Sequence, residues 1–197
     1  HTRLLTVTGV QTCALPIFAT ASPRAQASAD DRAVLERLTV ALDGETLLVR
    51  LADPATTPRV RVSLAALHLS SVVHQGVGAV TVVRLEGNRI DVSSTGGGSL
   101  VVAAIDTPVL AAILVGDGEM TLAGRAATAR LTLNGPGLLD AAALVADETA
   151  VTLSGEGDVR GTGRYAARVV ASGKGRVTVT GPMTCSVRAV KIGRAHV

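Results

Sequence analysis

Apolar and polar residues alternate along most of the chain between residues 60 and 190, and the alternation recurs about every 20 residues. Equivalent apolar positions are occupied by Val80, Leu100, Met120, Leu139, Val159 and Val177. Two residues further on stand Val82, Val102, Leu122, Ala141, Gly161 and Val179. A period of two indicates β-strands with one buried side, because successive strand side chains point to opposite faces.

A pair of glycines separated by one residue precedes each of these strands. The spacings between the first glycines of successive pairs are 20, 20, 19, 20 and 18 residues. The twelve glycines are Gly76, Gly78, Gly96, Gly98, Gly116, Gly118, Gly135, Gly137, Gly155, Gly157, Gly173 and Gly175. A fixed period in this range predicts a solenoid. We expect the glycines at its turns, where the chain must adopt a positive φ.

Short strands joined by glycine turns every 20 residues predict an all-β protein, a single-stranded parallel β-helix. Equivalent residues of neighbouring coils would stack about 4.8 Å apart, so that six coils form a rod of roughly 29 Å. Aromatic residues make up only 1% of the chain. That scarcity fits a narrow interior filled by stacked aliphatic side chains, which large rings would disrupt. It also argues against a protein that stacks the bases of single-stranded nucleic acids.

The chain before the repeats is less regular. Residues 38–51 predict a hairpin around Asp43-Gly44, residues 53–58 a loop, and residues 60–73 one further coil. Residues 19–33 are polar, and we expect them to be irregular. The most apolar stretch, residues 99–115, contains Asp106 and Pro108, and consecutive strands explain it better than a transmembrane helix.

The two ends of the chain differ from its middle. Codons for residues 192–197 exist whose reverse complement, shifted by one base, encodes residues 12–16, and both ends resemble translated sequencing adaptor. We therefore expect residues 1–18 and 191–197 to be adaptor-derived, and residues 19–190 to be a domain truncated at both ends. Without Arg3, Lys191 and Arg194 the formal charge falls from +3 to zero, with 16 Lys and Arg against 16 Asp and Glu.

Acidic residues at the glycine turns are the first candidates for chemistry: Asp117, Glu119, Glu156 and Asp158. Sugar hydrolysis needs two carboxyl groups about 5 to 10 Å apart, which acids on neighbouring coils could provide. The intervening coil has Pro136 and Leu138 at the matching positions, so no continuous acidic face is expected. The favoured interpretation is that these acids are solvated, and calcium binding is the weaker alternative. We predict no metal site and no cofactor.

Other reactive side chains are few. His68 and His74 have no cysteine or acid at metal-ligand spacing, and we expect both at the surface. Cys185 and Val187 fall on the inward phase of their strand, which predicts a buried, unreactive thiol. The candidates for a basic stripe along one side of the rod are Arg125, Arg130, Arg160, Arg164, Arg168 and Arg176. Pairing with nearby acids is the favoured interpretation of that stripe, and an anionic glycan is the alternative. A chain without net charge is a poor nucleic-acid binder.

The glycine phasing resembles the head GIN domain family of auto-transporter adhesins, most closely at residues 172–182, SGKGRVTVTGP, and at the hairpin preceded by residues 29–35. The resemblance covers residues 28–190. It implies a right-handed β-helix and an exported protein, which would be periplasmic, outer-membrane-associated or secreted. It supplies no catalytic residues.

These observations favour a non-enzymatic, adhesin-like scaffold or binding module whose partner is a glycan or a cell-envelope component. The alternative is a carbohydrate-active enzyme, or a glycan-binding module, on the same fold. A third hypothesis is end-to-end association through exposed strand edges.

Overall fold

The computed structural model describes residues 69–190 and six strand segments outside that range, residues 3–5, 24–29, 38–43, 46–51, 60–65 and 194–196. All regular structure in these residues is β-strand, and they include no helix that could cross a membrane. The strands before the long coils are β1 (Arg3–Leu5), β2 (Arg24–Ala29), β3 (Leu38–Asp43), β4 (Thr46–Leu51), β5 (Val60–Ala65), β6 (Ser71–Gln75), β7 (Ala79–Val82), β8 (Leu85–Glu86) and β9 (Arg89–Thr95). The remaining strands are β10 (Ser99–Val115), β11 (Glu119–Asn134), β12 (Leu138–Ser154), β13 (Asp158–Ser172), β14 (Arg176–Thr180), β15 (Thr184–Val190) and β16 (Arg194–His196).

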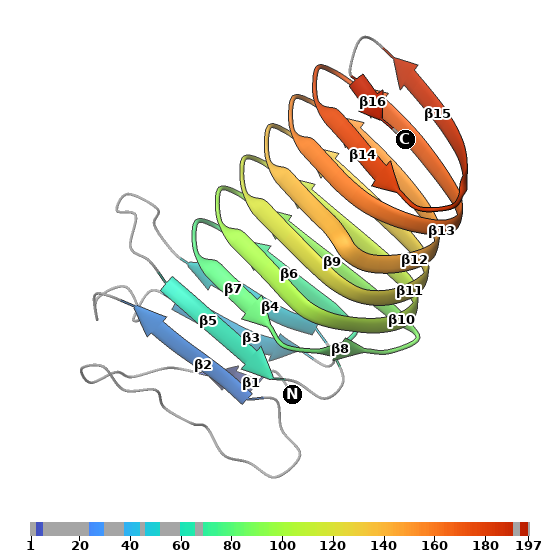
Figure 1. The fold of residues 1–197 in the computed structure, drawn as a ribbon. Helices are drawn as coiled ribbons and strands as arrows, with labels where there is room; N and C mark the ends of the chain where they lie inside the picture. Colours follow the sequence, from blue (N-terminus) through green and yellow to red (C-terminus); the bar gives the residue numbers. More distant parts are fainter. Residues whose placement is uncertain are drawn as a thin grey trace.

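The predicted parallel β-solenoid is confirmed. Strands β10 to β13 each bend through a whole coil and stack on one another in parallel register, with Leu100 beside Met120 and Met120 beside Leu139. The coils rise in sequence order from β7 to β15 (Figure 1). Backbone hydrogen bonds between strands therefore connect residues about one repeat apart.

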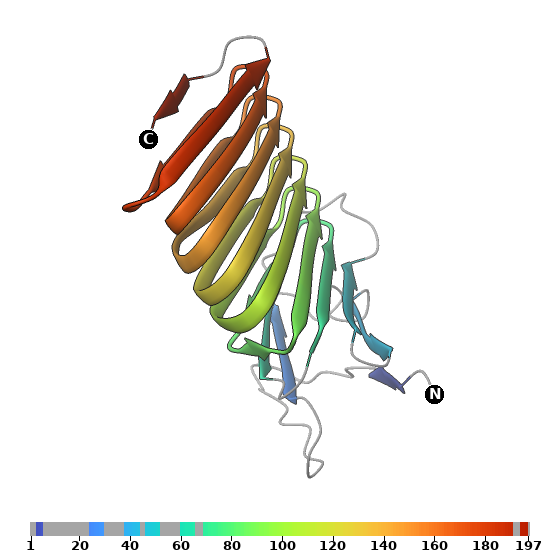
Figure 2. The same ribbon diagram turned by 90° about the vertical axis from the view of Figure 1, so that its right-hand side faces the viewer.

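Every coil has two main faces. We call the segment after each glycine pair the short face, formed by residues 79–82, 99–102, 119–122, 138–141, 158–161 and 176–179. We call the segment before the next glycine pair the long face, formed by residues 89–95, 109–115, 128–134, 148–154, 166–172 and 184–190. The long-face segments lie side by side and run in the same direction, on the side of the solenoid that faces the viewer in Figure 2.

The core is a set of aliphatic ladders between the two faces. Both rows predicted from the alternation are buried, from Val80 to Val177 and from Val82 to Val179. Leu114, Leu133 and Leu153 form a third ladder from the long face. Each Å² of apolar surface that is buried stabilises the folded state by about 25 cal/mol, so these ladders supply the main stabilisation of the fold.

The glycine pairs serve two different physical needs. The first glycine of each pair has a positive φ, from 111° at Gly96 to 126° at Gly155. Both glycines also lie against the coil before: a Cβ on Gly135 would lie 2.6 Å from the carbonyl oxygen of Gly116, and a Cβ on Gly137 would lie 2.5 Å from that of Gly118. A side chain at the second position would force neighbouring coils apart.

Differences in repeat length are absorbed at the bends between the faces. The register shifts lie between Val102 and Ile105, between Thr121 and Ala123, and in two places between Asp140 and Glu148. The turns and the buried ladders stay aligned because an extra residue in a ladder would turn every following side chain to the wrong face.

The first strands differ partly from the expectation. The predicted hairpin is present, since β3 and β4 pair antiparallel with Asp43 opposite Thr46, and residues 60–73 contribute the two coil strands β5 and β6. The expectation that residues 19–33 are irregular is wrong at β2, which pairs antiparallel with β5. Without β2, the edge of β5 away from β7 would leave its backbone groups unpaired. The predicted loop at 53–58 lies outside the described residues.

Candidate functional site

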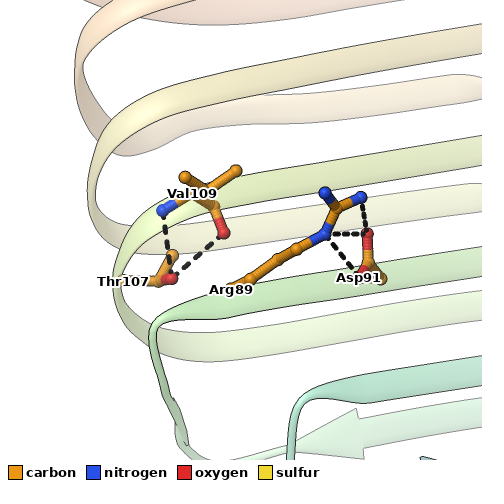
Figure 3. Close-up of polar contacts among 4 residues, drawn as sticks. All are labelled: Arg89, Asp91, Thr107 and Val109. Carbon is orange, nitrogen blue, oxygen red and sulfur yellow. Dashed lines mark hydrogen bonds and ion pairs between the residues drawn. The ribbon is translucent and has the colours of Figure 1, made fainter.

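The long face is the broadest regular surface of the described solenoid, and the bends beside it set its shape. At the bend into the long-face segment of β10, the buried Thr107 hydroxyl donates to the Val109 carbonyl at 3.0 Å and accepts from the Val109 N–H at 3.2 Å (Figure 3). One coil earlier, Arg89 donates to both oxygens of Asp91 at 3.0 Å. This hydrogen bond, together with the Asp91 charge, raises the pKa of Arg89, so that the guanidinium remains charged.

The long-face segment of β10, residues 109–115, is unusual because its outward side is apolar, as its inward side is. Val109, Ala111, Ile113 and Val115 all point outward, and Ile113 and Val115 are 42% and 37% exposed. On the next strand the matching positions hold Thr128, Arg130, Thr132 and Asn134. The long face therefore changes from an apolar strip on β10 to a polar surface on β11 and beyond.

The predicted turn acids fall on two coils that are not adjacent to each other. All four turn acids are exposed, and Glu119 and Asp158 stand two coils apart with Leu138 between them in register. Glu156 lies 3.9 Å from Lys174. Within the described residues, no group of three or more His, Cys, Asp or Glu is arranged to hold a metal ion.

The arginines do not form one stripe. Arg130 and Arg168 lie on the long face, Arg160 and Arg176 on the short face, and Arg125 and Arg164 near the bends. Three of them have the acidic partners that the sequence favoured: Arg125 with Asp106, Arg160 with Asp140 and Arg164 with Asp147. The alternative of a single stripe of all six arginines is excluded because the residues occupy different phases of the coil.

His74 is not a surface residue. It is 2% exposed, it points into the solenoid, and its Nδ1 makes a 2.8 Å hydrogen bond with the Ser94 hydroxyl on the next coil. The sequence missed this pair because the same inward row continues with leucines, starting at Leu114. Burial lowers the pKa of the His74 imidazole. His68 lies outside the described residues.

Acidification should therefore destabilise the domain through His74. The imidazole binds a proton less readily in the folded than in the unfolded state, so its contribution to stability is complete above a pH of about 6.5 and is lost as the pH falls below it. Urea denaturation at pH 7.5 and pH 5.5 should show a loss of stability for the wild type that is smaller in His74→Gln. An equal loss in both proteins would assign the effect to other groups.

Cys185 and Val187 are less buried than their inward phase predicts. Cys185 is half-buried against the core, and Val187 is 44% exposed, although they stand in register with the buried Ala167 and Val169. The difference arises because β15 pairs with β13 on one side and has no neighbour on the other side among the described strands. The predicted burial of the Cys185 thiol is therefore only partial.

The comparisons with known proteins agree with this architecture. The family model described as "Putative auto-transporter adhesin, head GIN domain" matches residues 20–182, which is most of the chain. The chain belongs to this family. The resemblance found in its glycine phasing is confirmed. No curated protein matches this head GIN domain.

Solved structures share the fold of this head GIN domain at low sequence identity. A putative adhesin from Bacteroides fragilis NCTC 9343 has a TM-score of 0.70 at 18% identity, over 89% of this chain and 82% of that chain. A putative lipid binding protein from Parabacteroides distasonis ATCC 8503 has a TM-score of 0.59 at 15% identity, over 98% and 93%. A putative adhesin from the same organism has a TM-score of 0.56 at 13% identity, over 99% and 94%. At such identities the likeness establishes the fold and not the ligand.

Proposed function

We propose that this domain is a non-enzymatic, adhesin-like binding module of the cell envelope that acts outside the cytoplasm and engages its ligand through the long face. The observation that supports this most is the outward side of β10, where Ile113 and Val115 are exposed next to Val109 and Ala111. Contiguous exposed apolar residues with a polar surround are typical of interaction sites. A stacked β-face offers such a site preformed, which limits the entropy lost on binding.

The family and the architecture support the same proposal. The family is described as a putative adhesin, and the domain's exposed acids are divided among the glycine turns, a bend (Asp106) and the long face (Glu148). An enzyme acting on polysaccharides would need convergent polar groups around its substrate. Export would place the module in the periplasm, on the outer membrane or in the medium.

Binding can be tested on an array of glycans and cell-envelope polysaccharides with Ile113→Glu as the long-face variant. We expect the array to bind the wild type and to bind Ile113→Glu at least about tenfold more weakly, because a carboxylate would stand on the apolar strip of the face and would repel an anionic ligand. Val83→Glu adds the same charge at an exposed valine outside the long face and should bind like the wild type. Equal binding by all three proteins would exclude the long face as the site.

Catalysis can be tested with the same polysaccharides. We expect no release of reducing ends and no unsaturated product after prolonged incubation with the wild type. Turnover that disappears in Asp158→Asn or Glu156→Gln, with folding unchanged by circular dichroism, would replace the binding-module proposal with a carbohydrate-active enzyme.

A further inference from the structure

We propose that the C-terminal half of the long face, from β11 to β13, binds an acidic polysaccharide through Arg130, Arg168 and Tyr165. We call this surface the arginine site. It rests on the proposed function, since it assumes that the long face is the binding face, and it adds the chemical class of the ligand.

The first observation is how charge is distributed after ion pairing. Residues 69–188 contain equal numbers of cationic and acidic side chains, and six ion pairs join most of them. The side chains outside these pairs are Arg130, Arg168, Arg176, Arg188, Asp117, Glu119, Glu148 and Asp158.

These remaining charges are separated between the two sides of the solenoid. The long face has three of the arginines and a single acid, Glu148, whereas the turns and the short face have the other three acids and Arg176. A domain whose described side chains are balanced in charge thus has a basic long face and an acidic opposite side. The favourable partner of the long face is therefore an anion.

The second observation is the geometry of Arg130 and Arg168. Both are exposed, and they occupy the same row of the long face with Ala150 between them, since Arg130 pairs with Ala150 and Ala150 with Arg168. Their Cα atoms are two strand spacings apart, about 9.6 Å. A small residue between two long cations leaves room for an anionic group over Ala150 that both guanidinium groups can reach. Guanidinium binds carboxylate and sulfate with paired, charge-assisted hydrogen bonds.

The third observation is the position of Tyr165, the one aromatic residue between 69 and 188. It lies in a bulge of β13, where Arg164 and Tyr165 together stand opposite the single residue Asp147 of β12. The Tyr165 side chain is 63% exposed. Arg164 lies over the ring at 5.3 Å from its centroid, and Asp147 holds Arg164 at 3.3 Å. Bulges commonly direct side chains at functional sites. An exposed tyrosine at the edge of the face can stack on a sugar ring.

The surrounding side chains favour a sugar polymer over a membrane or a nucleic acid. Thr132 and Thr152 supply outward hydroxyl groups in the row next to the arginines, which suit the many hydroxyls of a polysaccharide. The apolar strip that a lipid would need lies on β10, outside the arginine site. Nucleic-acid binding relies on many cations or on several stacking rings, and the two arginines and one tyrosine of the arginine site are too few.

The arginine site can be tested with polygalacturonate, which has one carboxylate per sugar, and with its fully methyl-esterified form, which has the same backbone without the charge. By titration calorimetry we expect the full chain to bind polygalacturonate at least about tenfold more tightly than the ester. The double variant Arg130→Gln/Arg168→Gln should lose at least about tenfold, and Tyr165→Ala several-fold. The matched control Arg160→Gln/Arg176→Gln removes the same charge from the short face and should bind like the wild type.

Glu148→Gln gives an opposite test, because it removes the one unpaired acid of the long face and should strengthen binding several-fold. Equal loss in the arginine double variant and its short-face control, or equal affinity for DNA of the same length, would overturn the arginine site as non-specific attraction. Binding of the ester as tightly as the acid would overturn it while leaving the proposed function intact. If neither polymer binds but another glycan on the array binds the wild type and not Ile113→Glu, the arginine site is likewise overturned and the proposed function stands.

Discussion

Gly124→Ala should lower the free energy of unfolding by more than about 3 kcal/mol, and Gly161→Ala should raise it by about 0.5 to 1 kcal/mol. Gly124 lies at a bend with a φ of 129°, and an added Cβ would overlap the backbone of Ile105 on the preceding coil. Backbone cannot move aside as a flexible side chain can. Strain from the positive φ and the overlap therefore act together.

Gly161 is the matched control, since it is also a glycine of a long bent strand. A Cβ there would lie 3.6 Å from Leu131 Cδ1, which is ordinary van der Waals contact. The equivalent inward positions of other coils hold Val102, Leu122 and Val179. Alanine would also reduce the conformational entropy of the unfolded chain. Urea denaturation of both variants checks the pair, and similar destabilisation by the two would contradict the assignment of the cost to the Gly124 bend.

Leu114→Ala should lower the free energy of unfolding by about 2 to 5 kcal/mol, whereas Ile113→Thr should change it by less than about 1 kcal/mol. The two residues are adjacent in β10, but Leu114 is 0% exposed in the core ladder and Ile113 points outward. Alanine at position 114 would leave a cavity between the ladders. The cavity could not collapse, because strand pairing holds the neighbouring coils in place. Threonine keeps the β-branched shape that suits a strand.

Thermal and urea denaturation of the two variants measure this difference. Because each coil contacts mainly its two neighbours, the loss at Leu114 should appear as a lower stability of the coils around β10. Hydrogen exchange would locate it there. A larger loss at Ile113 than at Leu114 would mean that the inward and outward phases of β10 are exchanged.

The repeat was predictable because its physical causes are local. Alternation of apolar residues fixes which side chains point inward, and a glycine pair every 20 residues fixes where each coil turns. The bends on the far side of the coil were not predictable, because Gly124 and Thr107 belong to no recurring motif. The only trace of them in the sequence is the variation of the spacing between 18 and 20 residues.

Candidate sites were harder to read because they depend on residues a full coil apart. The His74–Ser94 pair spans 20 residues, so only stacking brings the two side chains together. Arg125 is neutralised by Asp106 in the same way, whereas Arg130 and Arg168 have only uncharged in-register neighbours, the nearest shared one being Ala150. Counting charges along the chain cannot separate these cases.

The sequence by itself thus determined the strands of the repeats, the two buried rows beside the glycine pairs, the coil length and the family of this protein, since all of these follow from the periodicity of the chain. Only the tertiary structure decided which charges are paired, which face remains basic and where Tyr165 projects. The physical reason is that stacking places residue i beside residues about 18 to 20 positions away. Small changes in coil length at the bends then determine which side chains become neighbours.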